Sequence, residues 1–255
     1  MSDEKENPKL AASGLVDCVP NTGPCPQNCL ECYYNGPGWY RTRDEPLIPA
    51  VEDTEGKIVR VNSGHDSNIE RDKVIEVATK YADFFFNTSI PRFDFPGPVV
   101  FTCNGRAVTK DDLADSKAFL APPETPGFEN IMFVRFRLNM WNLPVANAVV
   151  AHYSALGISV VMTFMRYKDI NNIPEQYRKD YVFKKNVASE YFCLAPAVRN
   201  SVMKAWESNP KVLQCGSSFR PFCKYCGNCS WLYRQWKFEY YKRARAEIER
   251  AAGWV

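Results

Sequence analysis

Three closely spaced cysteines, Cys25, Cys29 and Cys32, place the strongest constraint on how this chain can fold. They lie in the stretch Cys25-Pro-Gln-Asn-Cys29-Leu-Glu-Cys32, with three and then two residues between them. Such spacing lets one short loop point three thiolates at a single centre, and Pro24 and Pro26 stiffen the loop. Three thiolates on a cubane of four irons leave one iron without a protein ligand. The pattern therefore indicates a [4Fe-4S] cluster with an open position.

Two other interpretations of these cysteines stay open. Structural zinc sites use similarly spaced thiolates, and thiols in a secreted protein pair as disulfides. The spacing favours the open cluster over zinc, and zinc over disulfides.

At these residues the sequence resembles the radical S-adenosylmethionine enzymes, whose signature is a Cys-x3-Cys-x2-Cys loop after the first strand of a partial α/β barrel. The resemblance covers eight residues. The family often has an aromatic residue before the last cysteine, whereas this chain has Glu31, with Tyr33 and Tyr34 just after the motif. The resemblance implies that the open iron binds the amino and carboxylate groups of S-adenosylmethionine. It also implies reductive cleavage of this cosubstrate to a 5′-deoxyadenosyl radical, with an electron donor such as flavodoxin or ferredoxin as partner.

The composition bears on the cellular location of the protein but does not identify its substrate. A formal net charge of +3, from 32 basic and 29 acidic side chains, gives no reason to expect general nucleic-acid binding. No run of about 18 apolar residues predicts a membrane span, and the polar first residues lack the apolar core of a signal peptide. We therefore expect a cytoplasmic protein whose cysteines serve metals or chemistry, with Cys18, Cys103 and Cys193 as buried small apolar residues. The substrate is left open between a peptide, a nucleotide and a nucleic acid.

Strand-like and helix-like segments alternate along the chain, which predicts an α/β fold with a mainly parallel sheet. With the resemblance, this becomes a partial (β/α)6-type barrel over 14–214, after a flexible leader at 1–13 and before a Cys-rich segment at 215–255. The strands are expected at 15–19, 57–62, 84–89, 98–104, 130–138, 158–165 and 211–214. The helices are expected at 70–84, 110–120, 144–156, 196–206 and 231–250, with Ser67 or Asn68 capping the first of them.

A second group of cysteines lies near the C-terminus. Cys215, Cys223, Cys226 and Cys229 have seven, two and two residues between them, and four thiolates close a metal site. Both a four-iron four-sulfur cluster and a structural zinc ion accept such a set. The resemblance favours an auxiliary [4Fe-4S] cluster, because many members of the family carry one there. A third interpretation is a staple that joins the last strand to the C-terminal helix.

S-adenosylmethionine is expected beyond the carboxyl ends of the strands, where ligands bind in α/β folds. In the family the loop after the second strand often reads Gly-Gly-Glu and binds the amino group; this chain has Ser63-Gly64-His65-Asp66 there. Gly64 allows close backbone approach and Asp66 accepts from an ammonium, although the same residues suit a helix-capping turn. His65 is either a proton donor or acceptor or a surface residue. Later strand ends supply further candidate contacts, or polar residues that face water: Asn104, Arg137 and Asn139.

The C-terminal helix mixes aromatic and basic side chains. Aromatics between bases can stack on single-stranded nucleic acid. The favoured interpretation is an amphipathic helix that docks its aromatics on the sheet and leaves a solvated basic face. If both cysteine groups bind zinc, the alternative function is a zinc-stabilised module that binds nucleic acid or protein.

Overall fold

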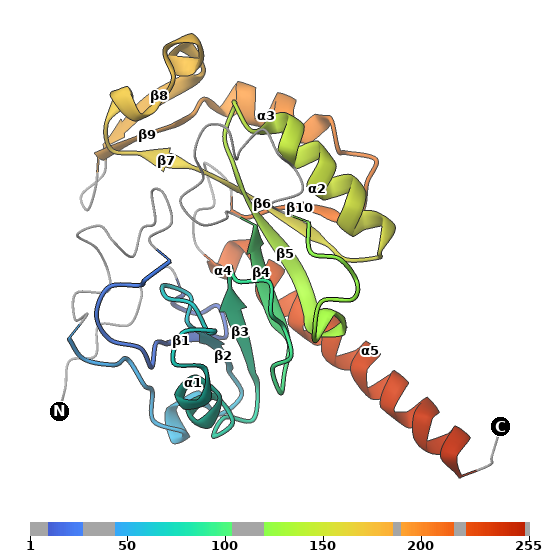
Figure 1. The fold of residues 1–255 in the computed structure, drawn as a ribbon. Helices are drawn as coiled ribbons and strands as arrows, with labels where there is room; N and C mark the ends of the chain where they lie inside the picture. Colours follow the sequence, from blue (N-terminus) through green and yellow to red (C-terminus); the bar gives the residue numbers. More distant parts are fainter. Residues whose placement is uncertain (1–9, 28–43, 104–119, 186–189, 217–222, 253–255) are drawn as a thin grey trace.

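Seven strands form one parallel sheet in the order β1-β2-β3-β4-β5-β6-β10 (Figure 1). The computed structural model describes residues 10–27, 44–103, 120–185, 190–216 and 223–252. Each strand lies within a segment predicted from the sequence, so the α/β class with a parallel sheet is confirmed. In the part of the chain that is described, β1 and β10 are the two edges and do not pair, so the barrel is not closed. The strands are β1 (Leu15–Cys18), β2 (Ile58–Val61), β3 (Phe84–Thr88), β4 (Val99–Cys103), β5 (Ile131–Leu138), β6 (Val160–Phe164) and β10 (Val212–Gln214).

The helices divide between the two faces of this sheet (Figure 1). On one face lie α1 (Arg71–Ala78), α2 (Leu143–Ala155) and α3 (Pro196–Lys204); on the other lies α5 (Asn228–Ala251), preceded by the short α4 (Cys223–Cys226). Short 3-10 turns occupy Glu52–Thr54, Phe128–Asn130, Ile170–Asn172 and Glu175–Asp180. The predicted helix at 110–120 lies outside the described residues except for its last residue. The first helix is shorter than predicted, and Glu70, in a left-handed conformation with φ 48°, stands at its N-cap.

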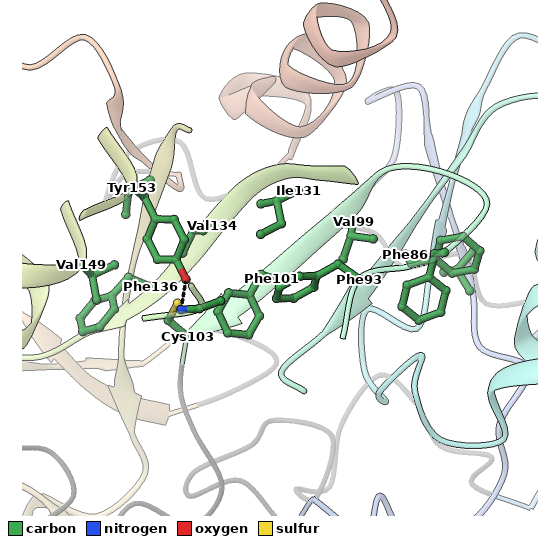
Figure 2. Close-up of a cluster of buried hydrophobic side chains, with 14 of the residues drawn as sticks. Phe86, Phe93, Val99, Phe101, Cys103, Ile131, Val134, Phe136, Val149 and Tyr153 are labelled. Carbon is green, nitrogen blue, oxygen red and sulfur yellow. Dashed lines mark hydrogen bonds between the residues drawn. The ribbon is translucent and has the colours of Figure 1, made fainter. Parts of the chain in front are cut away.

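The face covered by α1, α2 and α3 carries the larger apolar core (Figure 2). Side chains alternate along a strand, so Val134 and Phe136 of β5 point to this face and pack near Val149 and Tyr153 of α2. The Tyr153 hydroxyl accepts a hydrogen bond from the Ala121 N–H at 2.9 Å. Helices lie on both faces of the sheet, as is usual for parallel strands.

The opposite face changes character along the strands. Toward the amino ends it is apolar, and Phe85, Phe133 and Val161 pack against Leu232 and Tyr233 of α5. Asp83 fastens this helix further, because it accepts hydrogen bonds from Tyr233 Oη at 2.8 Å and from Lys237. Toward the carboxyl ends the same face is polar. This change puts the candidate site at the carboxyl edge.

A three-stranded antiparallel sheet follows β6 and was not predicted. Its order is β7 (Arg166–Tyr167), β9 (Glu190–Leu194) and β8 (Tyr181–Lys185). Tyr167 and Tyr181 are buried in this small sheet beside Trp141, with ring centroids 5.5 and 6.3 Å from the Trp141 ring. These aromatic contacts give the sheet its own small core.

The C-terminal helix docks fewer of its aromatics than expected. Leu232 and Tyr233 are buried, but Phe238 is 67% exposed and Tyr241 59% exposed. Figure 1 shows why: beyond its first turns, α5 runs away from the sheet. The favoured interpretation therefore holds for the start of the helix only. None of the helices in the described ranges is both long enough and apolar enough to cross a membrane.

Candidate metal centres and cosubstrate site

Six polar side chains cross the carboxyl half of the sheet on the face shared with α5; we call this set the polar band. Arg60 Nε donates to Asp17 Oδ1 at 2.7 Å and Arg60 Nη2 to Asp17 Oδ2 at 3.2 Å, so a bidentate ion pair is buried between β1 and β2. Arg135 Nη1 donates to Asn87 Oδ1 at 3.4 Å. Sequence reasoning did not recognise these six residues as a set, although each interrupts an apolar strand. The polar band consists of Asp17, Arg60, Asn87, Thr102, Arg135 and Thr163.

The four C-terminal cysteines gather at the end of β10. Cys215 directly follows this strand and its N–H donates to the Met162 carbonyl at 2.8 Å, which sets it beside Thr163 of the polar band. Cys223 and Cys226 begin and end α4, and Cys229 lies in the first turn of α5. The Gly216 N–H donates to Cys226 Sγ at 3.4 Å. A strand end, a short helix and a helix start thus bring together residues predicted as one site.

Electrostatics tie these thiols to one another and to the polar band. A hydrogen bond with Cys226 lowers the pKa of Cys215, burial opposes the shift, and the positive charges of Arg135 and Arg60 add to it. The same hydrogen bond raises the pKa of Cys226. Burial raises the pKa of Cys223 and of Cys229, and the two arginines act against it. Both guanidinium groups are therefore close enough to act on these sulfurs.

The second cysteine group stays a predicted metal site. In the described part of the chain, no three His, Cys, Asp or Glu side chains are grouped so that they could hold a metal ion as they stand. Four soft thiol side chains nevertheless lie in the same region as two positive charges, and this donor chemistry is compatible with a centre whose thiolates bring negative charge. Thiolates bind both a [4Fe-4S] cluster and zinc, so the metal of this site stays a prediction.

The N-terminal cysteine loop leaves the same edge of the sheet. Cys25 is half-buried, whereas Cys29 and Cys32 lie outside the described residues. The start of the loop is fixed to the segment after β2: Asn21 Nδ2 donates to the Ile69 carbonyl at 3.0 Å, and Asn62 Nδ2 donates to Asn21 Oδ1 at 2.7 Å. These bonds join the cysteine loop to the turn where the cosubstrate amino group is expected.

Asn62 is a candidate that sequence reasoning missed. It is fully buried at the end of β2 and has a φ of 54°, a left-handed conformation that asparagine tolerates better than most residues. Its Oδ1 accepts no hydrogen bond from any residue in the described ranges. A buried acceptor left unpaired costs about 1–3 kcal/mol, so this oxygen suits a donor that the described residues do not supply. An asparagine directly after an apolar strand was the available signal.

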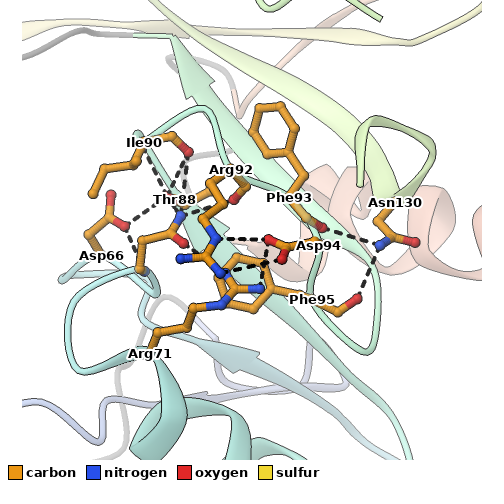
Figure 3. Close-up of polar contacts among 10 residues, drawn as sticks. Asp66, Arg71, Thr88, Ile90, Arg92, Phe93, Asp94, Phe95 and Asn130 are labelled. Atoms are coloured by element: carbon orange, nitrogen blue, oxygen red, sulfur yellow. Dashed lines mark hydrogen bonds and ion pairs between the residues drawn. The ribbon is translucent and has the colours of Figure 1, made fainter. Parts of the chain in front are cut away.

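Asp66 organises the turn that follows (Figure 3). Its Oδ1 accepts from the Asn68 N–H at 2.9 Å and from Thr88 Oγ1 at 2.7 Å; its Oδ2 accepts from Ser89 N–H and Oγ at 2.7 and 3.0 Å. These bonds join the turn to the end of β3. The turn therefore has a structural role, but it is not a helix cap, because Glu70 is the N-cap of α1 and makes no side-chain cap bond. Its cosubstrate contacts stay predictions, as they do for half-buried Ser63 and buried Gly64.

The remaining candidates have separate surroundings. Burial lowers the pKa of His65, although the Asp66 backbone and nearby carboxylates oppose the shift. This favours a neutral imidazole at pH 7. Arg137 Nε donates to Met165 Sδ at 3.1 Å. Asn139 exchanges hydrogen bonds of 2.9 and 3.0 Å with Asn142, at the start of α2. Asn104 lies outside the described residues.

No protein-family model, curated protein or solved structure matches this chain. Its function is therefore inferred from the placement of its own residues.

Proposed function

We propose that this protein is a radical S-adenosylmethionine enzyme with an auxiliary iron–sulfur centre. The observation that carries the proposal is the origin of the Cys25 loop at the carboxyl edge of the first strand in a parallel sheet of sequentially ordered strands. Such an order has no point where the strand sequence reverses, unlike a doubly wound sheet. With α1, α2 and α3 on one face, it supports a partial (β/α)6-type barrel in which β10 adds one edge strand.

In this proposal, different segments of the chain bind the cluster and the cosubstrate. Cys25, Cys29 and Cys32 would hold the catalytic [4Fe-4S] cluster, which when bound supplies the electron that cleaves S-adenosylmethionine to the radical that takes hydrogen from the substrate. Asn62 Oδ1 would accept from the cosubstrate ammonium, and Arg137 would meet its carboxylate. The four hydrogen bonds to Asp66 would keep the turn that follows Asn62 fixed. The polar band would then face the substrate, and a flavodoxin or ferredoxin would supply electrons.

Anaerobic reconstitution tests the proposal. The protein should bind about eight irons per chain, four per cubane, and release 5′-deoxyadenosine when reduced in the presence of S-adenosylmethionine. Replacing Cys25, Cys29 and Cys32 together with alanine should halve the iron and abolish 5′-deoxyadenosine formation. Cys193→Ala, which removes a half-buried thiol outside both groups, should change neither quantity. Cleavage that persists in the triple variant would contradict the proposal.

A second candidate is a zinc-stabilised module that binds nucleic acid or protein. The exposed aromatics of α5 favour it, because Phe238, Tyr240 and Tyr241 lie among Lys242 and Arg243. This candidate predicts colourless, air-stable protein with about two zinc ions per chain. Metal analysis of the purified protein separates the two candidates directly.

A further inference from the structure

We propose that Arg135 raises the reduction potential of the iron–sulfur centre held by Cys215, Cys223, Cys226 and Cys229. The inference rests on the proposed function, because it requires this second centre to be an iron–sulfur cluster and not zinc. It assigns a role to a residue of the polar band that contributes no metal ligand.

The sheet register puts Arg135 on the side of the sheet where the cysteines gather. Arg135 of β5 lies opposite Val161 of β6, which lies opposite Leu213 of β10, and Cys215 follows two residues after Leu213. Parallel partners point to the same face, so the four positions share one surface. Cys223 and Cys229 pack against the apolar cluster on this face. The sulfurs and the Arg135 guanidinium therefore share one layer, between the sheet and the start of α5.

Arg135 also carries a charge that its described neighbours do not cancel. The charge of Arg60 is matched by Asp17 in their bidentate pair. Arg135 instead donates to the neutral amide of Asn87 and lies 5.9 Å from the centre of the Phe133 ring. Within the described ranges, no carboxylate lies within 4.0 Å of its nitrogens.

A positive charge acts on the two redox states unequally. Reduction transfers one electron from a low-potential donor such as reduced flavodoxin to the cluster; the donor loses that electron, and no bond or proton is exchanged. The cluster becomes more negative, so the nearby guanidinium stabilises the reduced state more than the oxidised one. Because Arg135 is only half-exposed, solvent and salt screen this effect less than at the surface.

A charge series at one position tests the inference. Arg135→Lys, Arg135→Gln and Arg135→Glu are made in the full chain with Cys25, Cys29 and Cys32 replaced by alanine, so that only the second centre remains. Its potential is measured by redox titration monitored by electron paramagnetic resonance. The lysine variant should match the parent, the glutamine variant should have a lower potential, and the glutamate variant a lower one still. Arg92→Gln, at an exposed arginine paired with Asp94, should have no effect.

The possible failures are distinguishable. Equal potentials across the series, with iron retained, would overturn the inference and leave the proposed function intact. An equal fall in the lysine and glutamine variants would also overturn it, since the effect would then follow shape and not charge. Zinc at this site would overturn it as well, and 5′-deoxyadenosine formation by the wild-type protein would still report separately on the first cluster. If the glutamate variant fails to bind iron, the reduction potentials of the lysine and glutamine variants still show whether the charge at this position sets the potential.

Discussion

Asn62 joins three properties in one residue: complete burial, a left-handed backbone, and an amide oxygen that accepts no hydrogen bond within the described ranges. Its amide nitrogen meanwhile holds Asn21, at the start of the cysteine loop. Because its amide nitrogen is bonded to the loop and its amide oxygen is unpaired, the Asn62 side chain is well placed to accept a hydrogen bond from a bound ammonium group.

We predict that Asn62→Gly weakens S-adenosylmethionine binding by roughly 10- to 150-fold, the equivalent of a lost hydrogen bond to a charged group. Glycine tolerates the left-handed backbone, so the change removes the amide with little strain. Asn62→Asp is the matched control, because aspartate keeps an acceptor and also tolerates this conformation; it should retain binding. Equilibrium binding to the anaerobically reconstituted protein measures both. Equal affinity in the glycine variant and the wild type would exclude the contact.

At the scale of elements, α5 is held by its first turns. Leu232 is 5% exposed and packs against the sheet, whereas Phe238, less than two turns later, is 67% exposed. We predict that Leu232→Ala lowers the free energy of unfolding by about 2–5 kcal/mol, because it leaves a cavity in a packed core. Phe238→Ala should change it by less than about 0.5 kcal/mol. Denaturant unfolding of both variants checks this; similar losses would mean that the outer part of α5 is also docked.

The main helices and strands were predictable because apolar residues recur along them in clear patterns. The nearly continuous apolar run at 158–165 and the repeated valines and phenylalanines of β3, β4 and β5 leave few alternatives to buried strands. The small sheet was missed because β8 and β9 are half-exposed and carry charges such as Lys184 and Glu190, which hide the alternation. The length of α5 was predicted, but its exposure was not, since the sequence does not show where the sheet ends beneath it.

The candidate site was predictable only in part. Cysteine spacing predicted both groups of candidate ligands, since spacing is a local property. The polar band was not recognised, because a sequence does not distinguish a polar residue that faces solvent from one that faces a covered face of a sheet. Arg60 is an example: its partner Asp17 is 43 residues away in the chain and adjacent only in the folded sheet. Asn62 escaped notice because its significance lies in backbone conformation and an unpaired atom.

At the scale of the whole molecule, the strand order explains why one edge can serve both proposed centres. All seven strands are parallel, so their carboxyl ends share one edge, where the Cys25 loop leaves β1 and Cys215 ends β10. These strands are the two outermost in the sheet. A substrate over the polar band would therefore have the proposed catalytic cluster toward one side and the auxiliary centre toward the other. Arg135 on β5 lies nearer the auxiliary side.

The outward course of α5 has a consequence for how the molecule behaves in solution. Its 24 residues span about 36 Å, roughly twice the radius of gyration of about 18 Å expected for a compact chain of 255 residues. A rod that extends from a rounded body increases friction and adds long interatomic vectors. We predict a radius of gyration above about 18 Å by small-angle X-ray scattering and an extended tail in the distance distribution. A value at or below 18 Å without such a tail would mean that the helix folds back onto the body, and its aromatic side chains would then be sheltered from water.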